Sequence, residues 1–487
     1  MNAQSPGTGR TAIWIAGCLL LLAGLFLPAW VNRQPIMYPD SVGYFHSGYA
    51  AVKQIKSVAD VHLRGRPKPA APVLSRQQSD GITTARSVYY GLTYVVGYVL
   101  AGVWGLAAGQ VLLTFACLLL AAQRAVRLDL IPWFGALGAI VLISGLNVFA
   151  VTAMPDLFAG LMLLATAMIL AYAPQLPRWE YAFWLAVVVL SGLYHKGHLA
   201  ILVLSLAGAA LLPFTWRRRG RDLLLLAGAV LVALAGHYAV DLTVRQVTGK
   251  WPISTPFLLA RMVGDGTAEK YLREVCPAHP FATCDYLGKM PMTENDFLWS
   301  RDPEKSVMGA ANSQTRRAIA DESTAIVWGT LTRYPLEQAA ATARNVMMQL
   351  SDVGVGEYRL LPSDTVAPIP MLRWALDHYQ NTAIANGWMP LMPISVLMRG
   401  IYFAALVGIG SLLYRRTRGL GADNQDVGFV LVLLIGILSN AIVSGAISGV
   451  FDRYQGRVAW LASLGFACLV GKMIADKRQA SGVLKSR

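Results

Sequence analysis

Acidic side chains follow two apolar stretches of this 487-residue sequence, at the point where each stretch ends. Asp40 lies in Tyr38-Pro-Asp-Ser-Val-Gly-Tyr44, and Asp156 lies in Met154-Pro-Asp156. A carboxylate at such a boundary can serve as general base for an acceptor hydroxyl and stay close to a lipid-anchored substrate. Each aspartate can equally cap the helix that follows it, because Asp at a helix start accepts backbone N–H bonds. The residues alone leave both interpretations open.

Basic residues lie at two further boundaries between apolar stretches. Tyr194-His-Lys-Gly-His198 joins two of them, and Phe451-Asp-Arg-Tyr-Gln-Gly-Arg457 precedes the last one. Lys196 can hold a phosphate with its fixed charge, or it can extend toward the lipid headgroups. Arg453 and Arg457 suit bidentate contact with a phosphate, and the alternative is a structural ion pair with the preceding aspartate. These segments are therefore candidates for binding a phosphate-bearing substrate.

Two histidines have the spacing of metal ligands. His195 and His198 are three residues apart, but no acidic partner accompanies them, which makes the pair a weak metal signal. No glycine-rich nucleotide loop occurs in a suitable setting, so direct use of a soluble nucleotide is not expected. The net charge of +15 is not accompanied by any nucleic-acid-binding motif. We expect no nucleic-acid partner and leave the cofactor open, with a divalent metal as one alternative.

The elements that must position these residues are apolar enough to use lipid as their solvent. The sequence is 55% apolar and 14% charged, with a mean hydropathy of +0.47. Several runs approach the ~20 residues that cross a bilayer. This pattern predicts an all-α polytopic membrane protein with about ten transmembrane helices. The expected spans lie near residues 12–30, 104–122, 133–154, 157–172, 181–194, 199–213, 223–240, 392–414, 427–447 and 458–474.

The polar segments between these spans divide the sequence into six regions. One of them, an outer domain, is inserted between spans seven and eight. The regions are residues 1–31, the N-terminus with span one; 32–103, a first outer loop with interfacial helices; 104–240, spans two to seven; 241–391, a mostly helical outer domain; 392–475, spans eight to ten; and 476–487, a disordered basic tail.

Short basic clusters predict the orientation, because Lys and Arg accumulate in cytoplasmic loops. Clusters at residues 217–221, 415–418 and 472–478 each flank an apolar run and place both termini in the cytoplasm. The connection at residues 32–87 is also basic, but a long loop counts less in this rule. The first apolar run ends in Leu-Pro-Ala-Trp30 without a small-residue cleavage site, so we expect it to stay as an anchor.

Two of the five cysteines share one polar loop of the predicted outer domain. Cys276 and Cys284 are separated by eight positions, whereas the other three cysteines lie inside apolar runs and suit the core. A disulfide persists only in an oxidising compartment, and the charge pattern independently places this loop outside. We therefore predict a disulfide between them.

In combination these segments resemble the GT-C superfamily of membrane glycosyltransferases, of the protein mannosyltransferase and aminoarabinose transferase type. The first acidic motif resembles that of the superfamily's first outer loop, and Asp156 lies where a second acid is common. Three further segments also match. Arg86 with Tyr89 and Tyr90 resembles the entrance to an interfacial helix, His195-Lys-Gly197 is similar to a Thr-Lys-Gly-like turn after span five, and Arg453-Tyr454 resembles a late Arg-Tyr motif. All five segments occur along the chain in the order typical of the superfamily.

The resemblance implies an inverting transfer of a sugar from a polyprenyl-phosphate carrier to an envelope lipid, glycan or protein. The reaction would take place on the outer face of a bacterial inner membrane, with Asp40 as base or acceptor-orienting group and Asp156 as a second catalytic acid. One acid stands in the first motif where many relatives have two, which leaves metal use open. The residues expected to bind the donor phosphate or substrate are Arg86, His195, Lys196, His198, Arg453, Tyr454 and Arg457.

Other classes of membrane protein share parts of this pattern. An O-antigen ligase-like or polymerase-like enzyme also has a large outer loop, but it has less reason for an acid after span one. A transporter or flippase of envelope lipids should carry polar residues near the bilayer midplane, whereas here the ionisable groups collect at outer helix ends. A non-catalytic assembly protein would not need these groups to converge in space.

Overall fold

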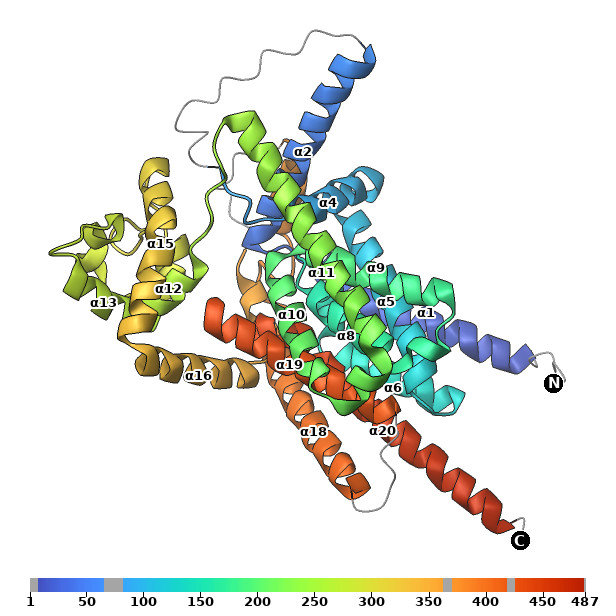
Figure 1. The fold of residues 1–487 in the computed structure, drawn as a ribbon. Coiled ribbons are helices and arrows are strands. Elements are labelled where there is room, and N and C mark those ends of the chain that lie inside the picture. The colour runs from blue at the N-terminus through green and yellow to red at the C-terminus, as the bar shows by residue number, and fades with distance from the viewer. Residues whose placement is uncertain (1–7, 65–81, 362–369, 418–424, 486–487) are drawn as a thin grey trace.

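The computed structural model describes residues 8–64, 82–361, 370–417 and 425–485, which form helices joined by turns and loops (Figure 1). The all-α membrane fold is therefore present over these ranges. Its first half contains α1 (Thr8–Val31), α2 (Pro39–Arg64), α4 (Val88–Ala101), α5 (Val103–Ala125), α6 (Leu130–Ile143), α7 (Leu146–Val151), α8 (Leu157–Tyr172), η1 (Ala173–Gln175), α9 (Arg178–Tyr194), α10 (Lys196–Ala210) and α11 (Pro213–Thr248). Its second half contains α12 (Phe257–Gly264), α13 (Thr267–Val275), η2 (Ala282–Lys289), α14 (Glu294–Trp299), α15 (Ser313–Arg333), α16 (Pro335–Ser351), η3 (Gly356–Arg359), α17 (Pro370–Tyr379), α18 (Leu391–Thr417), α19 (Gln425–Ile447) and α20 (Asp452–Lys485).

Seven helices of the described residues are long and apolar enough to cross a membrane, namely α1, α5, α8, α11, α18, α19 and α20. The remaining stretches predicted as spans form shorter helices. α6, α9 and α10 contain 14, 17 and 15 residues. At ~1.5 Å of rise per residue, each of them covers only part of a ~30 Å hydrocarbon layer.

The stretch predicted as one span at residues 133–154 is broken between α6 and α7. Gly145 at the break has a φ of +78°, a left-handed conformation that glycine adopts without strain. A side chain at this position would be strained by this φ, and its Cβ would lie 2.4 Å from the end of the Met398 side chain. The chain turns again after α7, and α8 begins directly after Asp156. The break thus places this carboxylate at a helix start.

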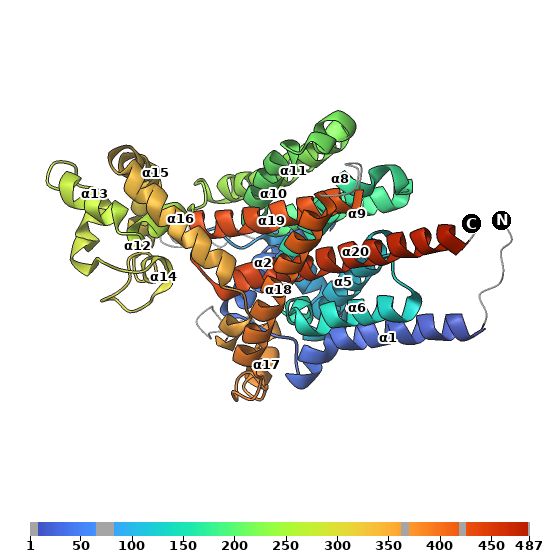
Figure 2. The same ribbon diagram turned by 90° about the horizontal axis from the view of Figure 1, so that it is seen from below.

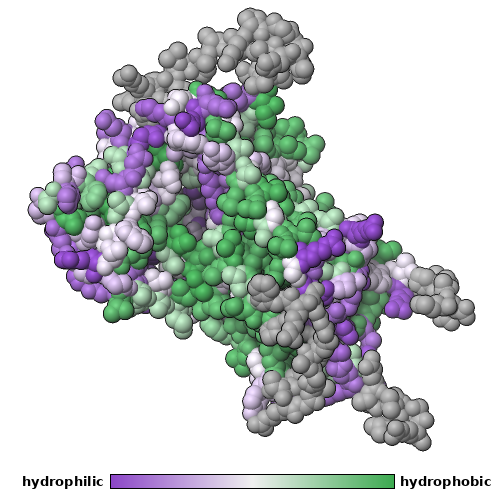
Figure 3. Space-filling view, viewed as in Figure 1, coloured by the Kyte–Doolittle hydropathy of each residue, from purple (hydrophilic) through white to green (hydrophobic). Residues whose placement is uncertain are grey.

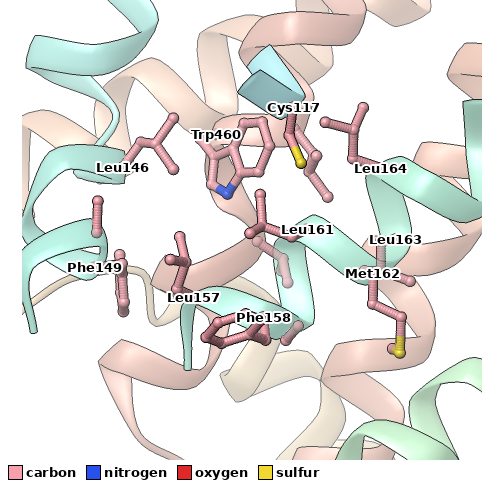
Figure 4. Packing of buried hydrophobic residues seen from close by; sticks show 14 of the residues in the cluster. Cys117, Leu146, Phe149, Leu157, Phe158, Leu161, Met162, Leu163, Leu164 and Trp460 are labelled. Carbon is pink, nitrogen blue, oxygen red and sulfur yellow. The ribbon is translucent and has the colours of Figure 1, made fainter. Parts of the chain in front are cut away.

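α8 lies at the centre of the helix bundle, and all 16 of its residues are buried. Figure 4 shows Leu157 and Leu161 of this helix packed near Trp460 of α20. The two helices approach closely at Gly160, where a Cβ would lie 2.7 Å from the carbonyl oxygen of Arg457. This close contact brings the start of α8 next to the first turns of α20.

The surface of the molecule is divided by hydropathy in the way expected for a membrane protein. The start of α1 and the end of α20 lie at the same end, and α12 to α15 lie at the opposite end (Figures 1 and 2). Hydrophobic residues cover the middle in Figure 3, between hydrophilic groups at the two ends. Apolar side chains such as Leu231 of α11 and Val407 of α18 are 66% and 69% exposed. A soluble protein would bury such a belt, so these side chains face lipid.

The region predicted as one outer domain, residues 241–391, has two parts with different cores. Helices α12 to α15 enclose a separate buried cluster that includes Leu259 and Phe297. The described residues after α16, among them Tyr358 and Leu372, pack on the main core instead, and the Tyr379 hydroxyl donates a hydrogen bond to the Met37 carbonyl oxygen at 3.0 Å. The second part therefore belongs to the body of the membrane fold, because its apolar side chains are buried against the segment that follows α1.

Cys276 and Cys284 form a disulfide, and their Cα atoms are 5.8 Å apart. The bond links the end of α13 to η2 within the separate core. Among the other cysteines, Cys117 and Cys468 are buried thiols. The bridge therefore closes a short loop of the separately packed part of the chain.

The C-terminal segment predicted as a disordered tail is helical as far as Lys485. It continues α20 without a break, because good helix formers such as Lys, Ala, Arg and Gln predominate after residue 470. Arg478 donates to Asp129 at 2.7 Å, which ties this extension to the start of α6. In the basic connection at residues 32–87, positions 65–81 lie outside the described residues, as does position 418 of the second basic cluster.

Candidate functional site

A buried ion cluster joins the start of α8 to the start of α20. The two oxygens of Asp156 accept from two different guanidinium groups, at 2.9 Å from Arg453 Nη1 and 3.0 Å from Arg457 Nη1. All three side chains are less than 8% exposed. Arg453 and Arg457 are four residues apart on one helix, so they lie on the same face and can meet one carboxylate. The sequence left open a structural ion pair between Arg453 and the adjacent Asp452. The structure instead pairs Arg453 with Asp156, which is distant in the sequence.

The remaining N–H groups of both arginines also have protein partners. Arg453 Nε donates to Glu357 at 2.8 Å and its Nη2 to the Tyr454 hydroxyl at 3.3 Å. Arg457 donates to Asn440 from both Nε and Nη2, at 3.2 and 3.0 Å. The two guanidinium groups are thus occupied in this structure. To bind a donor phosphate, as the sequence predicted, they would have to exchange these partners.

Burial affects the two carboxylates of this cluster in opposite ways. Burial by itself raises the pKa of Asp156, but the charges of Arg453 and Arg457 more than offset it and hold that pKa below 3.8. For Glu357, burial is the larger effect and raises the pKa from 4.5 to about 7, although Arg453 opposes it. Asp156 is therefore a permanent charge near neutral pH, and Glu357 is a group that titrates there.

Asp40 forms a second, partly exposed ion pair just beyond the end of α1. Its Oδ1 accepts from Arg86 Nη2 at 2.5 Å, and the two side chains are 29% and 22% exposed. This is its one hydrogen bond to the described residues, so Asp40 does not cap α2 through a backbone N–H. Ser41 accepts from the Tyr38 N–H at 2.9 Å at that helix start instead. The Oδ2 atom of Asp40 is left available to a substrate.

Tyrosine rings lie between the exposed pair and the buried cluster. The Arg453 guanidinium lies 4.7 Å from the centre of the Tyr38 ring, and the Arg86 guanidinium 5.8 Å from that of Tyr44. Burial is the main cause that raises the pKa of Tyr38, and Arg453, Glu357 and Asp40 all act on it. The ring of Tyr38 also packs edge-on against that of Tyr358, the residue after Glu357, with 5.9 Å between the ring centres. The structure thus brings the two predicted acidic motifs and the late Arg-Tyr motif into one region.

The two predicted metal-ligand histidines are neighbours, with ring centres 4.9 Å apart. His195 Nδ1 accepts from the Gly197 N–H at 3.1 Å, and His198 Nδ1 lies 2.9 Å from the Ser191 carbonyl oxygen. Burial, followed by the charge of Arg457, lowers the pKa of His195 to about 3, so its ring is neutral at pH 7. Across the described residues, no three side chains of His, Cys, Asp or Glu gather as a metal site.

Lys196 lies apart from the buried cluster, on the surface between three segments. Its Nζ is 3.3 Å from the Thr84 hydroxyl and 3.4 Å from Asp241, and the side chain is 47% exposed. Thr84 precedes Arg86 by two residues, so this contact ties the segment that carries the exposed ion pair to α10 and α11. Lys196 keeps enough exposure to contact a ligand.

Sequence reasoning missed two members of the cluster, Glu357 and Asn440. Glu357 lies in Gly354-Val-Gly-Glu-Tyr-Arg359, inside the region expected to form a separate outer domain. Asn440 lies within α19, where a buried amide in an apolar span was the available signal. Both residues join the site through helix packing, which neither local pattern records.

Comparisons with known proteins found no relative of this chain. Family models give no match to the chain, and searches of curated proteins and of solved structures likewise find none.

Proposed function

We propose that this chain is a membrane glycosyltransferase that moves a sugar from a polyprenyl-phosphate carrier to an envelope acceptor. The observation that carries the proposal is the partly exposed Asp40–Arg86 pair beside the buried Asp156–Arg453–Arg457 cluster. These groups lie at helix ends instead of the middle of the apolar spans. This placement suits chemistry at a membrane surface on a lipid-linked substrate better than passage of a solute.

The proposal includes ten spans and a fixed orientation. Seven are the long apolar helices, and α6 with α7, α9 and α10 supply the other three. In the proposed orientation both termini lie in the cytoplasm of a bacterium and the catalytic end lies on the outer face of the inner membrane. The basic clusters at residues 217–221, 415–418 and 472–478 favour this orientation. A polyprenyl carrier then presents its sugar at the depth where Asp40 lies.

Asp40 and Arg86 take complementary roles in this reaction. The acceptor hydroxyl gives its proton to Asp40 Oδ2 as its oxygen forms a bond to the anomeric carbon of the sugar. The bond from that carbon to the phosphate oxygen breaks, and the electron pair leaves with the polyprenyl phosphate. Arg86 uses one N–H on Asp40, and its other N–H groups make no hydrogen bond to the described residues. They can bind the departing phosphate and stabilise its developing charge.

Asp156 acts in this scheme through the residues that it holds. Its carboxylate fixes the guanidinium groups of Arg453 and Arg457, and Arg453 in turn lies over the ring of Tyr38, two residues before the proposed base. The cluster thereby keeps the start of α2 in place. A direct catalytic role for Asp156 would require a substrate to displace at least one of these arginines.

The test is sugar transfer by the purified chain, reconstituted in liposomes with a radiolabelled polyprenyl-phosphate sugar and an envelope lipid extract as acceptor. The wild-type chain should release polyprenyl phosphate and label the extract. Asp40→Asn keeps the shape of the side chain but removes the base, so its rate should fall by at least ~10²-fold with an unchanged thermal midpoint.

Asp377→Asn provides the matched control. Asp377 is 68% exposed and pairs with Arg373 at 3.9 Å on α17, so its substitution should leave transfer unchanged. Transfer by Asp40→Asn at the wild-type rate would exclude the assigned base. If the wild-type chain transferred sugar from none of the polyprenyl-phosphate donors, the proposed function itself would be wrong.

A further inference from the structure

A cavity of about 290 Å³ is lined in part by Glu357, which also accepts a hydrogen bond from Arg453 of the buried cluster. Its wall is made of η3 with residues on both sides of it, the first three turns of α18, and the turn that leads into α20. Asp452 holds this wall together, because its carboxylate accepts from the Gly356 N–H at 2.7 Å and its carbonyl oxygen accepts from the Gly354 N–H at 3.0 Å. The cavity is therefore a part of the fold and continuous with the buried cluster.

One side of this cavity is apolar and faces lipid. Met392 and Val396 line it and are 57% and 68% exposed, and both belong to α18, a helix long and apolar enough to span the membrane. Leu360 adds a further exposed apolar side chain. A molecule that enters from the bilayer beside α18 would reach the cavity without crossing water.

Other residues that line the cavity carry charged groups with unused hydrogen-bonding capacity. Glu357 Oε2 accepts from Arg453, while its Oε1 accepts no hydrogen bond from the described residues. Arg359 is exposed and has no ion-pair partner in the described part of the chain. Arg399 pairs with Asp352 at 2.7 Å and leaves its side chain 44% exposed. Asp352 and Asp452 line the cavity as well, and Asp352 Oδ2, like Glu357 Oε1, accepts no hydrogen bond from the described residues. The cavity thus offers two accessible guanidinium groups and two free carboxylate oxygens.

We propose that this cavity binds the headgroup of an anionic membrane lipid that carries a free hydroxyl. Arg359 and Arg399 bind the headgroup phosphate, Glu357 Oε1 accepts a hydrogen bond from the hydroxyl, and the acyl chains lie along Met392 and Val396 of α18. Resting on the proposed function, we assign this lipid as the acceptor, because Arg453 both donates to Glu357 and lies over the ring of Tyr38, two residues before Asp40.

The size and the boundary of the cavity favour a lipid headgroup over other occupants. Small-molecule sites measure roughly 300–1,000 Å³, so about 290 Å³ accommodates a headgroup and excludes a folded protein segment. A soluble phosphate would use the arginines but leave the lipid-facing wall of Met392 and Val396 without a partner. The combination of an apolar wall and paired guanidinium groups matches an amphipathic ligand.

The experiment measures binding of short-chain phosphatidylglycerol to the purified chain in detergent by isothermal titration calorimetry. Phosphatidylcholine of equal chain length, which has no headgroup hydroxyl and no net charge, should bind at least tenfold more weakly. Arg359→Ala should weaken phosphatidylglycerol binding about tenfold through loss of a charge-assisted hydrogen bond. Val396→Trp should abolish binding by filling the cavity, whereas Val407→Trp, equally exposed on α18 but outside the cavity, should bind as the wild-type chain does.

Three results would overturn the proposal: equal binding of the two lipids, wild-type binding by Arg359→Ala and Val396→Trp, or equally tight binding of glycerol phosphate without acyl chains. Because calorimetry requires no catalysis, lipid binding can succeed where sugar transfer fails, and the two proposals are judged separately. The acceptor assignment adds one readout, in which Val396→Trp raises the acceptor KM at least tenfold without changing the donor KM. Unchanged acceptor KM would limit the cavity to a non-substrate lipid and reject the assignment.

Discussion

Asp156 offsets the positive charge of the buried cluster, because one of its oxygens accepts from Arg453 and the other from Arg457. Asp156→Asn retains the shape and one acceptor oxygen, but it leaves two buried guanidinium groups with one less negative charge. Removal of one partner from a buried ion pair destabilises a protein by about 3–5 kcal/mol. We expect a clear fall in the thermal midpoint of the detergent-purified chain, measured by intrinsic tryptophan fluorescence.

The control for this substitution is an ion pair in solvent. Glu337 pairs with Lys270 at 2.8 Å, but the side chains are 55% and 50% exposed, so Glu337→Gln should cost less than about 1 kcal/mol. A wild-type midpoint for Asp156→Asn, together with a large loss of sugar transfer, would show that Asp156 acts on the substrate and not on the fold.

Glu357 makes the fold sensitive to pH near neutrality. Its pKa rises from 4.5 to about 7 in the folded chain, chiefly through burial, so the folded state keeps a proton that the unfolded state releases in this window. Stability contributed by this group is therefore complete below pH 4.5 and declines as the pH rises toward 7, by about 3 kcal/mol at most.

Thermal midpoints recorded between pH 4.5 and 8 check this expectation. Glu357→Gln has no group to titrate, so the difference in midpoint between the variant and the wild-type chain should grow in favour of the variant from pH 5 to pH 7. A difference that stays constant over this range would contradict the assigned shift.

At the scale of elements, the contact between α8 and α20 decides whether the cluster assembles. Gly160→Ala would place a Cβ 2.7 Å from the carbonyl oxygen of Arg457, and backbone at this distance cannot move aside without shifting the helix. The helix propensity of alanine favours the substitution by roughly 1 kcal/mol, so a net loss of stability reports the steric conflict. We expect a lower thermal midpoint and slower transfer, because α20 carries both cluster arginines.

Gly228→Ala tests the propensity effect by itself. Gly228 lies within α11 with no atom within 4 Å of the added Cβ, so this variant should be as stable as the wild-type chain or more so. If Gly160→Ala matched the gain of Gly228→Ala, the close approach of α8 and α20 would not be required.

At the scale of the molecule, the distribution of charge predicts which end faces the cytoplasm. Two variants, Lys305→Cys and Gly220→Cys, test this orientation. Residue 305 lies on the surface after α14, in the predicted outer domain, and residue 220 lies within the basic cluster at residues 217–221. A membrane-impermeant maleimide applied to intact cells should label the first variant and leave the second unlabelled until the membrane is opened. The reverse pattern would move Asp40 and the whole candidate site to the cytoplasmic face.

Much of the architecture follows from local sequence patterns. Apolar runs of sufficient length identify membrane helices because burial in lipid depends on summed side-chain hydropathy, which a window of the sequence contains. The pairing of Cys276 with Cys284 is similarly local, since the two cysteines are eight positions apart. The break at Gly145 was missed because an apolar run does not record where glycine must adopt a positive φ.

The contacts of the candidate site were decided by the tertiary structure. Asp156 and Arg453 are 297 residues apart and meet because Gly160 lets α8 and α20 pack closely. Glu357 joins them only because its segment packs on the membrane bundle and not on the separate outer core. The sequence by itself determined which charged residues lie at membrane boundaries, because their cost in lipid excludes most other places. Which of these charges pair depends on the distances between helices, and those distances come from packing.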